Sequence, residues 1–369
     1  MSMTSQRVQP RRLVDGIKVA FGEQAIRLSG RGLCCSFRQG EHFYRRTLNG
    51  QWWRVDGVRQ RLDEPQVDSL LGALREYCQA LLRQRLDPEV AELIRHSLHV
   101  DYDADGARYR QIYREDVPIL PPDRYRDLVV QPATGCPNSR CNFCAFYRQH
   151  PFAVLSEPDF QQQLIDIKDW LGDGFRHRNG VFLGSANALA LSQRRLLVVL
   201  AHIYQQFGAL SRGVASFWDP DFSPARTLSE WRALRRAGVR RLVVGVETGA
   251  GSLRQQLGKS GDMQQLAQML TGARGGGMEL GLCILVGAGG QSGSQYHLQQ
   301  TLQWVSALQL QPQDLIYLSQ LRTDSEHLSG APEQEPWMKA ELRQFSHHLA
   351  SATQAKVTEY RMEHYGYYS

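Results

Sequence analysis

The feature that most constrains the fold is an alternation of short apolar segments with amphipathic ones, which runs from about residue 126 to residue 325. The apolar segments have the length and residue types of strands, and those between them carry apolar residues at helical spacing. Six candidate strands are present: DLVVQPA, GVFLGSA, RGVASFW, VRRLVVGVE, LGLCILVGA and DLIYLSQL. Because strands that alternate with helices form parallel βαβ units, we expect an α/β fold with a partial (β/α)6 barrel. Binding sites in such folds lie at the C-terminal ends of the strands.

The first 125 residues follow a different pattern, which predicts a small α+β domain before the barrel. Residues 25–57 contain short strand-like segments with glycine turns, and Asn49-Gly50 is a typical hairpin turn. Residues 67–86 have helical spacing, whereas residues 99–116 alternate like two strands around the turn DADG. The proline-rich segment 118–125 is the expected boundary. The predicted domains are therefore 1–125, the barrel 126–330, and a C-terminal helix with a tyrosine-rich tail over 331–369.

Composition narrows the class of protein. The 369 residues are 42% hydrophobic and 22% charged, which excludes disordered, collagenous and coiled-coil chains. No apolar run approaches the roughly 18 residues of a membrane span, and the N-terminus lacks the apolar core of a secretory signal. Seven cysteines are an odd count for a disulfide framework, so we expect a reducing cytoplasm and metal or redox chemistry.

The net charge of +6 has two interpretations. It favours a solvated basic surface, with a phosphate-bearing partner as the alternative. Much of the excess lies in separated pairs along the chain: Arg11-Arg12, Arg45-Arg46, Arg235-Arg236 and Arg240-Arg241.

The segment TGCPNSRCNFCAFYR, after the first candidate strand, carries the strongest chemical signal. Cys136, Cys141 and Cys144 form a C-x4-C-x2-C triplet, and Phe143 precedes the last cysteine. Three thiolates can bind three irons of a [4Fe–4S] cluster, which leaves the fourth iron open to chelate a substrate or cofactor. The alternatives are a structural zinc site completed by His150, and three thiols without a metal. Zinc sites usually come as paired knuckles, and the sequence offers no second one.

This motif resembles that of the radical SAM superfamily, in which a cysteine triplet, usually C-x3-C-x-aromatic-C, follows the first strand of a partial barrel. Here the first gap is four residues instead of three. The resemblance implies a [4Fe–4S] cluster whose open iron binds S-adenosylmethionine (SAM). Reductive cleavage of SAM would then give a 5′-deoxyadenosyl radical that abstracts a hydrogen atom from the substrate. The resemblance places Phe143 beside the adenine.

The resemblance also implies SAM contacts at the ends of later strands. In FLGSANAL, residues Gly184, Ser185 and Asn187 occupy the position of a Gly-Gly-Glu-like motif that binds the SAM ammonium group. Asn187 would offer an amide oxygen where relatives often have a carboxylate. The alternative for this segment is a plain turn whose glycine and serine cap the next helix.

Three further strands supply the remaining candidate contacts. The strand end GVETG resembles that of the coproporphyrinogen-dehydrogenase and methylthiotransferase branch, and implies Gly245 and Glu247 as contacts to SAM. A helix cap is the alternative for Glu247. Val286 and Gly287 are candidate backbone contacts, and Ser216 is a candidate contact to the ribose or carboxylate. Cys283, between apolar neighbours, is expected to be a core thiol.

The remaining candidates lie outside this core. Adjacent Cys34 and Cys35 point to opposite faces of a strand, so with Cys78 they make a poor auxiliary cluster. The C-terminal tail has two possible roles: it either closes the barrel mouth over a substrate or packs on the barrel surface. Its candidate residues are Tyr360, Glu363, Tyr365, Tyr367 and Tyr368. One N-terminal segment could bind an acidic or phosphorylated substrate, or its side chains could pair across neighbouring strands. Its residues are His42, Phe43, Tyr44, Arg45 and Arg46.

The sequence therefore predicts a cytoplasmic radical SAM enzyme with a single cluster. Its substrate class stays open between a small molecule, a peptide and an RNA, and it would need a reductant such as flavodoxin or ferredoxin. The alternative is a nucleic-acid-binding or scaffold protein with a structural zinc or iron–sulfur site, which the isoelectric point near 9.0 favours.

Overall fold

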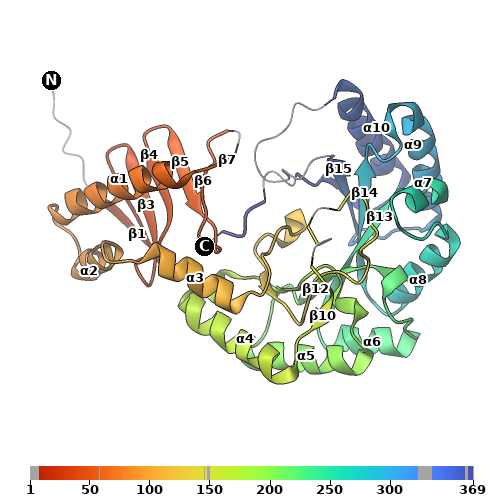
Figure 1. The fold of residues 1–369 in the computed structure, drawn as a ribbon, viewed down its shortest axis with the longest axis horizontal. Helices are drawn as coiled ribbons and strands as arrows, with labels where there is room; N and C mark the ends of the chain where they lie inside the picture. The colour runs from red at the N-terminus through yellow and green to blue at the C-terminus, as the bar shows by residue number, and fades with distance from the viewer. Residues whose placement is uncertain are drawn as a thin grey trace.

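The computed structural model describes residues 8–57, 59–144, 146–147, 150–322, 335–361 and 365–368. Two separate seven-stranded sheets organise this part of the chain, one antiparallel and one parallel. The antiparallel sheet and its helices form the N-terminal part, and the parallel sheet is the inner layer of a partial barrel (Figure 1). No helix in the described ranges has the length and apolarity to cross a membrane.

The parallel sheet has the strand order β16-β15-β14-β13-β12-β11-β8. Every neighbouring pair in it is parallel, so all the strand C-termini meet at one end. The strands are β8 (Leu128–Val130), β11 (Val181–Leu183), β12 (Val214–Trp218), β13 (Val239–Glu247), β14 (Glu279–Val286), β15 (Leu315–Gln320) and β16 (Lys356–Glu359). A small two-stranded sheet, β9 (Ala133–Thr134) and β10 (Ala153–Val154), brackets the cysteine loop.

All six predicted strands are present, but the prediction stopped one strand short. The seventh, β16, lies in the segment predicted to be a helix followed by a tail. It is only four residues long, and none of its residues is fully buried. An edge strand of this kind carries too little apolar patterning to be recognised from sequence.

Helices cover the outside of the parallel sheet (Figure 1). Their starting points follow from the sequence, because Ser156, Ser192, Thr227 and Asp262 cap four of them with side-chain oxygens. The helices are α4 (Glu157–Leu171), α5 (Gln193–Phe207), α6 (Leu228–Arg236), α7 (Gly251–Gln256), α8 (Met263–Gly275), α9 (Gly290–Ala307) and α10 (Pro336–Ala352).

The N-terminal sheet is a simple antiparallel meander, ordered β1 to β7. Its strands are β1 (Gln9–Leu13), β2 (Gly16–Phe21), β3 (Gln24–Ser29), β4 (Cys34–Gln39), β5 (His42–Arg46), β6 (Trp52–Arg54) and β7 (Gln60–Arg61). Helices α1 (Glu64–Leu82) and α2 (Pro88–Ser97) share an apolar core with this sheet, which includes Cys34 and Cys78. This antiparallel sheet with its helices is compatible with the α+β character predicted for this part.

One prediction for the N-terminal part is wrong. Residues 99–116 were expected to form strands around a turn, yet helix α3 spans Tyr102–Ile112. Asp101 caps this helix by accepting a hydrogen bond from the amide of Ala104, so the acidic segment begins a helix and makes no hairpin. The alternation of apolar and polar residues favours strands, but the cap outweighs it. The cap gives a hydrogen-bond partner to one of the first amides of the helix, which have none within the helix.

The chain end joins the two sheets. Tyr367 accepts a hydrogen bond at its hydroxyl from the amide of Val129 on β8, and its carbonyl accepts one from the amide of Leu48. Thr47 and Tyr368 form an antiparallel bridge, and the C-terminus lies between the N-terminal sheet and the barrel (Figure 1). Of the tail candidates, Tyr360, Tyr365 and Tyr367 are buried, and Glu363 lies outside the described residues.

Asp105 on α3 is the polar joint between the two parts. Its carboxylate accepts hydrogen bonds from Arg46 on β5 at 2.7 Å and from the indole of Trp170 on α4 at 2.8 Å. The side chain of Arg46 is fully buried, so the carboxylate of Asp105 offsets the cost of removing its charge from water. The same carboxylate lies 3.3 Å from Arg31.

We expect Asp105→Asn to lower the free energy of unfolding by about 2 kcal/mol, because the amide keeps the shape but loses the charge that pairs with Arg46. Chemical denaturation measures this change. The control Asp103→Asn alters an exposed carboxylate of the same helix and should cost less than about 1 kcal/mol. Equal losses in the two variants would contradict the role of Asp105.

Candidate functional site

The cysteine loop follows β9, at the end of the barrel where the parallel strands finish. Cys136, Cys141 and Cys144 all line one cavity of about 200 Å³, called the cysteine cavity below. Phe143 lines it as well. Other wall residues lie at or just after the C-terminal ends of five strands: Ala186, Asp219, Glu247, Leu285 and Gln320. The position expected from the strand pattern is therefore the position of this cavity.

Hydrogen bonds hold the cysteine loop against the barrel. The side-chain amide of Asn138 donates to the sulfur of Cys141 at 3.2 Å, and its carbonyl oxygen accepts from the amide of Arg140. Asn142 donates from its side chain to the carbonyl of Gln256 at 2.7 Å, at the end of α7. Gly258 has a φ of +85°, and a Cβ there would lie 2.1 Å from the carbonyl oxygen of Arg140. Only glycine allows the loop to approach so closely.

The three cysteines fit an iron–sulfur cluster by the chemistry of their donor atoms. No disulfide joins any of the seven cysteines, so the loop offers three sulfur ligands at a cavity wall. Burial raises the pKa of Cys136 to about 11 and that of Cys141 to about 12. Without a metal these thiols hold their protons, and ligation would release them. Within the described ranges, no three His, Cys, Asp or Glu side chains are already placed to hold a metal ion together.

The structure gives no support to the zinc alternative. His150, the fourth ligand that this alternative needs, is exposed. It does not line the cavity that the three cysteines share.

A buried ion pair between Glu247 and Lys259 lines the cysteine cavity. The ammonium group of Lys259 lies 2.9 Å from Glu247 Oε1 and donates to the carbonyl of Gly245 at 2.7 Å. Both side chains are less than a tenth exposed. Burial alone would lower the pKa of Lys259, but the carboxylates of Glu247 and Asp219 outweigh it and raise this pKa. Sequence reasoning missed Lys259, whose only signal is that a buried carboxylate needs a cationic partner.

Glu247 does not cap the helix that follows it. Helix α7 starts after Ala250 without a side-chain cap, and the hydroxyl of Thr248 accepts the amide of Ala250 instead. Glu247 has a φ of 67° beside a register shift in β13, which turns its carboxylate into the cysteine cavity. Gly245 lines the same cavity, and so does Cys283, so the expectation of a plain core thiol is incomplete.

The FLGSANAL segment lies next to the cysteine cavity, but none of its three candidate residues lines that cavity. Gly184 and Ser185 line a small neighbouring void, and the buried hydroxyl of Ser185 has no hydrogen-bond partner there. Asn187 is buried and donates to the carbonyl of Asp219 at 3.3 Å, while its amide oxygen accepts from the hydroxyl of Ser223. Asn187 therefore fastens the loop after β12, and Ala186 is the residue of this segment at the cavity wall.

The remaining three candidates do not line the cysteine cavity. Ser216 is fully buried and donates to the carbonyl of Leu183 at 3.1 Å. The amide of Gly287 donates to the carboxylate of Glu341 on α10 at 2.6 Å, and the carbonyl of Val286 accepts from Leu321. Each of these backbone or hydroxyl groups thus already has a partner within the fold.

A buried histidine on helix α9 predicts how the stability of the folded chain depends on pH. His297 on α9 is fully buried between the hydroxyl of Thr248 at 2.8 Å and the carbonyl of Leu285 at 3.1 Å. Burial lowers the pKa of His297 from 6.5 to about 4, so the folded chain favours the neutral form of this side chain. Below pH 6.5 the unfolded chain takes up the proton first, and the free energy of unfolding falls until about pH 4.

We expect the wild type to lose about 3 kcal/mol from this one residue between pH 6.5 and pH 4. His297→Gln should remove that part of the pH dependence, which denaturation at a series of pH values measures. The control His99→Gln changes an exposed histidine and should leave the profile as it is. An unchanged slope in His297→Gln would contradict the assignment.

Comparisons with known proteins find similarity in structure alone. No protein-family model matches the chain, and no curated protein matches its sequence. Among solved structures, the radical SAM enzyme HemN, coproporphyrinogen III oxidase from Escherichia coli, is 16% identical over 67% of this chain and 56% of its own, with a TM-score of 0.45. The cobalamin-dependent SAM radical enzyme OxsB is 18% identical over 61% of this chain and 30% of its own, with a TM-score of 0.39.

The chain is similar to radical SAM enzymes. A third example, the radical SAM methyltransferase TsrM from Kitasatospora setae, is 14% identical over 54% of this chain and 38% of its own, with a TM-score of 0.40. The chain spans less than two thirds of each, and the identities are low.

Proposed function

We propose that this chain is a radical SAM enzyme that binds a [4Fe–4S] cluster through Cys136, Cys141 and Cys144. The observation that carries the proposal is that these three cysteines and the Glu247–Lys259 pair line one cavity at the C-terminal ends of the parallel strands. When bound, the cluster supplies the electron that cleaves SAM into methionine and a 5′-deoxyadenosyl radical able to abstract hydrogen from a substrate. The number of cysteines matters, because three ligands leave one iron open.

The cavity walls carry the charges that SAM requires. SAM has an ammonium group, a carboxylate and a sulfonium, so its site needs groups of both signs. Glu247 and Asp219 offer carboxylates for the cationic groups, and Lys259 offers a cation for the carboxylate. We infer that Glu247, Gly245 and Phe143 are the most direct of the predicted contacts. The unpartnered hydroxyl of Ser185, in the neighbouring void, is a further candidate.

The thiol of Cys283 also lines this cavity. Burial, followed by the charge of Glu247, raises its pKa. Cys283 belongs to strand β14 and not to the cysteine loop. In the proposed function it is therefore a wall of the site and not a cluster ligand.

The proposal includes the setting of the enzyme. We infer a cytoplasmic protein that receives its electron from a flavodoxin- or ferredoxin-like reductant, because thiolate-bound clusters exposed to air are oxidised. Residues 1–125 are proposed as a separate N-terminal domain beside the barrel of 126–330 and the C-terminal segment of 331–369. Strand β16, within 331–369, pairs with β15, so the C-terminal segment would complete the barrel sheet.

The decisive experiment is anaerobic reconstitution of the full chain with iron and sulfide. The proposal predicts about four irons and four sulfides per chain, and formation of 5′-deoxyadenosine when SAM and dithionite are added. Matched samples without dithionite should form none. Stoichiometric zinc without iron, or a full complement of iron with no cleavage of SAM, would overturn the proposal.

A further inference from the structure

A second and larger cavity lies between the N-terminal sheet and the barrel. Its volume is about 630 Å³, and it is called the basic cavity below. One wall includes residues from strands β1 to β5 of the N-terminal sheet. The opposite wall includes Arg126 and Arg178, which precede strands β8 and β11. The cavity therefore lies at the N-terminal ends of the barrel strands, opposite the end that carries the cysteines.

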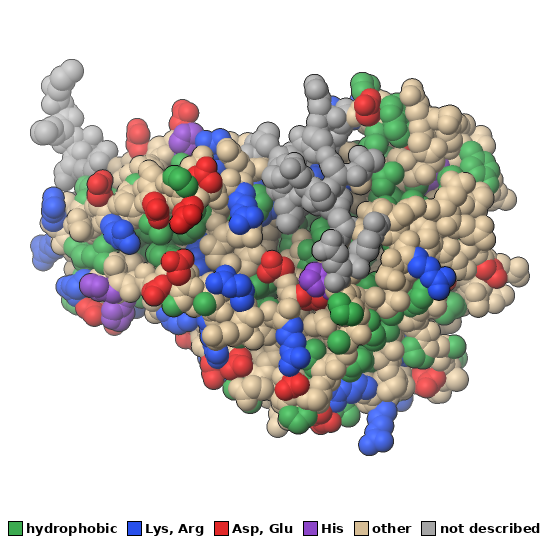
Figure 2. Space-filling model, in the orientation of Figure 1, with side chains coloured by type: hydrophobic (Ala, Val, Ile, Leu, Met, Phe, Trp, Pro, Cys, Tyr) green, Lys and Arg blue, Asp and Glu red, His purple; other side chains and the backbone are tan. Residues whose placement is uncertain are grey.

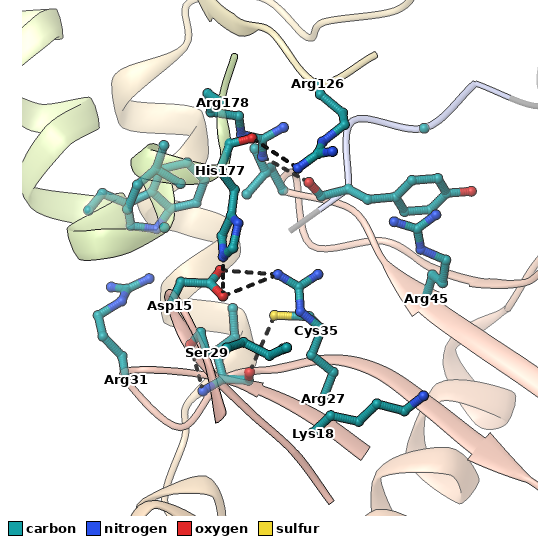
Figure 3. A pocket seen from close by; sticks show the side chains of 18 of the residues that line it. Asp15, Lys18, Arg27, Ser29, Arg31, Cys35, Arg45, Arg126, His177 and Arg178 are labelled. Atoms are coloured by element: carbon teal, nitrogen blue, oxygen red, sulfur yellow. Dashed lines mark hydrogen bonds and ion pairs between the residues drawn. The ribbon is translucent and has the colours of Figure 1, made fainter. Parts of the chain in front are cut away.

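The walls of this cavity are strongly cationic. Among the described lining residues, Asp15 is the one carboxylate. Six side chains with a permanent positive charge line it: Lys18, Arg27, Arg31, Arg45, Arg126 and Arg178. Figure 3 shows Arg126 and Arg178 on one side, facing Lys18 and Arg27 on the other. On the outer face in Figure 2, in contrast, basic and acidic side chains are intermingled.

Two of the six cations have a carboxylate partner. Arg27 lies 3.1 Å from Asp15, which also contacts His177 at 2.6 Å (Figure 3). Arg31 lies 3.3 Å from Asp105, the joint between the two parts. These pairs fix the edge of the cavity and neutralise part of its charge.

In the described part of the chain, Arg45, Arg126 and Arg178 contact carbonyl groups or an aromatic ring and no carboxylate. Arg178 donates to the carbonyl of Tyr368 at 2.9 Å, and Arg126 donates to the carbonyl of His177 at 3.4 Å. Arg45 lies over the ring of Tyr368, 3.5 Å from its centre. Carbonyl groups and rings orient a guanidinium but leave its full charge in place. The excess of charge is thus concentrated where the two walls face each other.

The burial of Arg45 makes this excess costly for the folded chain. Burial lowers the pKa of Arg45, and the neighbouring charge of Arg27 acts in the same direction. A bound anion would relieve both effects, because it would replace lost hydration with an opposite charge. A cavity whose charge is unfavourable when empty favours an anionic ligand.

We propose that the basic cavity binds a phosphate-bearing ligand, held between Arg45 of the N-terminal sheet and Arg126 and Arg178 of the barrel. Guanidinium groups bind phosphate in a planar, paired geometry, and several of them around one point suit a multiply charged anion better than a single carboxylate. A free nucleotide or pyrophosphate presents this chemistry, and so does the backbone of a single-stranded RNA. The proposal does not depend on the cysteine cavity, which lies at the other end of the strands.

The first test is calorimetric titration of the full chain with pyrophosphate. The double variant Lys18→Gln/Arg126→Gln changes two exposed side chains of the cavity and should weaken binding at least about tenfold. Arg45→Gln should weaken it to a similar extent. The control Arg232→Gln/Arg236→Gln removes the same charge from two exposed positions on α6, outside this cavity, and should change binding less than about twofold.

The second test separates the two sources of phosphate. The same titrations use AMP and a single-stranded RNA of about ten nucleotides, at several salt concentrations. Binding of AMP and pyrophosphate alone assigns the cavity to a free ligand. Tighter RNA binding with a steep salt dependence, lost in Lys18→Gln/Arg126→Gln, assigns it to a nucleic acid backbone.

Two outcomes would overturn the proposal. One is the absence of binding by all three probes at concentrations on the order of 1 mM. The other is an equal loss of binding in the cavity variant and in the α6 control, which would show a general surface effect. Reductive cleavage of SAM in the cavity variants is measured in parallel. It tests the proposed function separately, because neither Lys18 nor Arg126 lines the cysteine cavity.

Discussion

Replacing Cys141 by serine should leave the reconstituted chain without a stable [4Fe–4S] cluster and without formation of 5′-deoxyadenosine. The side chain is buried at the cavity wall, where its sulfur accepts a hydrogen bond from Asn138. A serine oxygen keeps the size of the side chain but is a poor ligand for iron in such a cluster. We expect activity to fall by more than the roughly 10- to 100-fold that follows loss of an outer-shell partner.

The chain supplies its own control for this experiment. Cys283 lines the same cavity, yet it belongs to strand β14 and not to the cysteine loop. Cys283→Ser should therefore retain iron and sulfide close to the wild-type amounts, while Cys136→Ser and Cys144→Ser should behave like Cys141→Ser. Absorbance of the anaerobic sample, iron counting and 5′-deoxyadenosine formation give three separate readouts. Full iron in Cys141→Ser, or loss of iron in Cys283→Ser alone, would contradict the ligand assignment.

The position of this site could be predicted because two independent patterns agree. The strand rhythm places the loop after β9 at the C-terminal end of the barrel, and the cysteine spacing indicates the chemistry that we propose for that loop. The separation of Cys34 and Cys35 was predictable for a similar reason. They alternate across β4, so Cys34 enters the N-terminal core while Cys35 lines the basic cavity.

The contacts at the other strand ends could not be fixed in the same way. The position of a residue in a motif indicates which strand end it follows. It does not indicate whether the polar group of that residue forms hydrogen bonds with a neighbouring loop. Asn187 illustrates this, because Asp219 and Ser223 from the loop after β12 take its amide. Gly287 is a second case, since its partner Glu341 comes from α10, more than fifty residues later. Partners so distant in sequence are set by tertiary packing.

The positions of the charged side chains in the basic cavity could not be predicted from the sequence either. The sequence shows arginine pairs such as Arg45-Arg46, but the two members have opposite fates. Arg46 is fully buried against Asp105, whereas Arg45 lines the cavity. Their side chains alternate across β5, so a pair in sequence becomes one structural cation and one available cation. Arg126 and Arg178 join Arg45 only through the docking of the barrel on the sheet.

The second large effect is expected from Lys259→Met. This change removes the ammonium group that lies 2.9 Å from Glu247 and leaves a buried carboxylate without its cation. Removal of one partner of a buried ion pair typically costs about 3 to 5 kcal/mol, because the remaining charge stays desolvated. We expect a loss of that size in the free energy of unfolding, measured by chemical denaturation of the chain without iron.

A double variant tests whether this loss comes from the stranded charge. In Glu247→Gln/Lys259→Met no unpaired charge remains, so the double variant should be more stable than Lys259→Met alone, a coupling that a thermodynamic cycle isolates. The control Lys339→Met removes an exposed lysine of α10 and should cost less than about 1 kcal/mol. If the double variant is less stable than Lys259→Met, the pair does not act through its charge. The carbonyl of Gly245, which also accepts from Lys259, would then carry the effect.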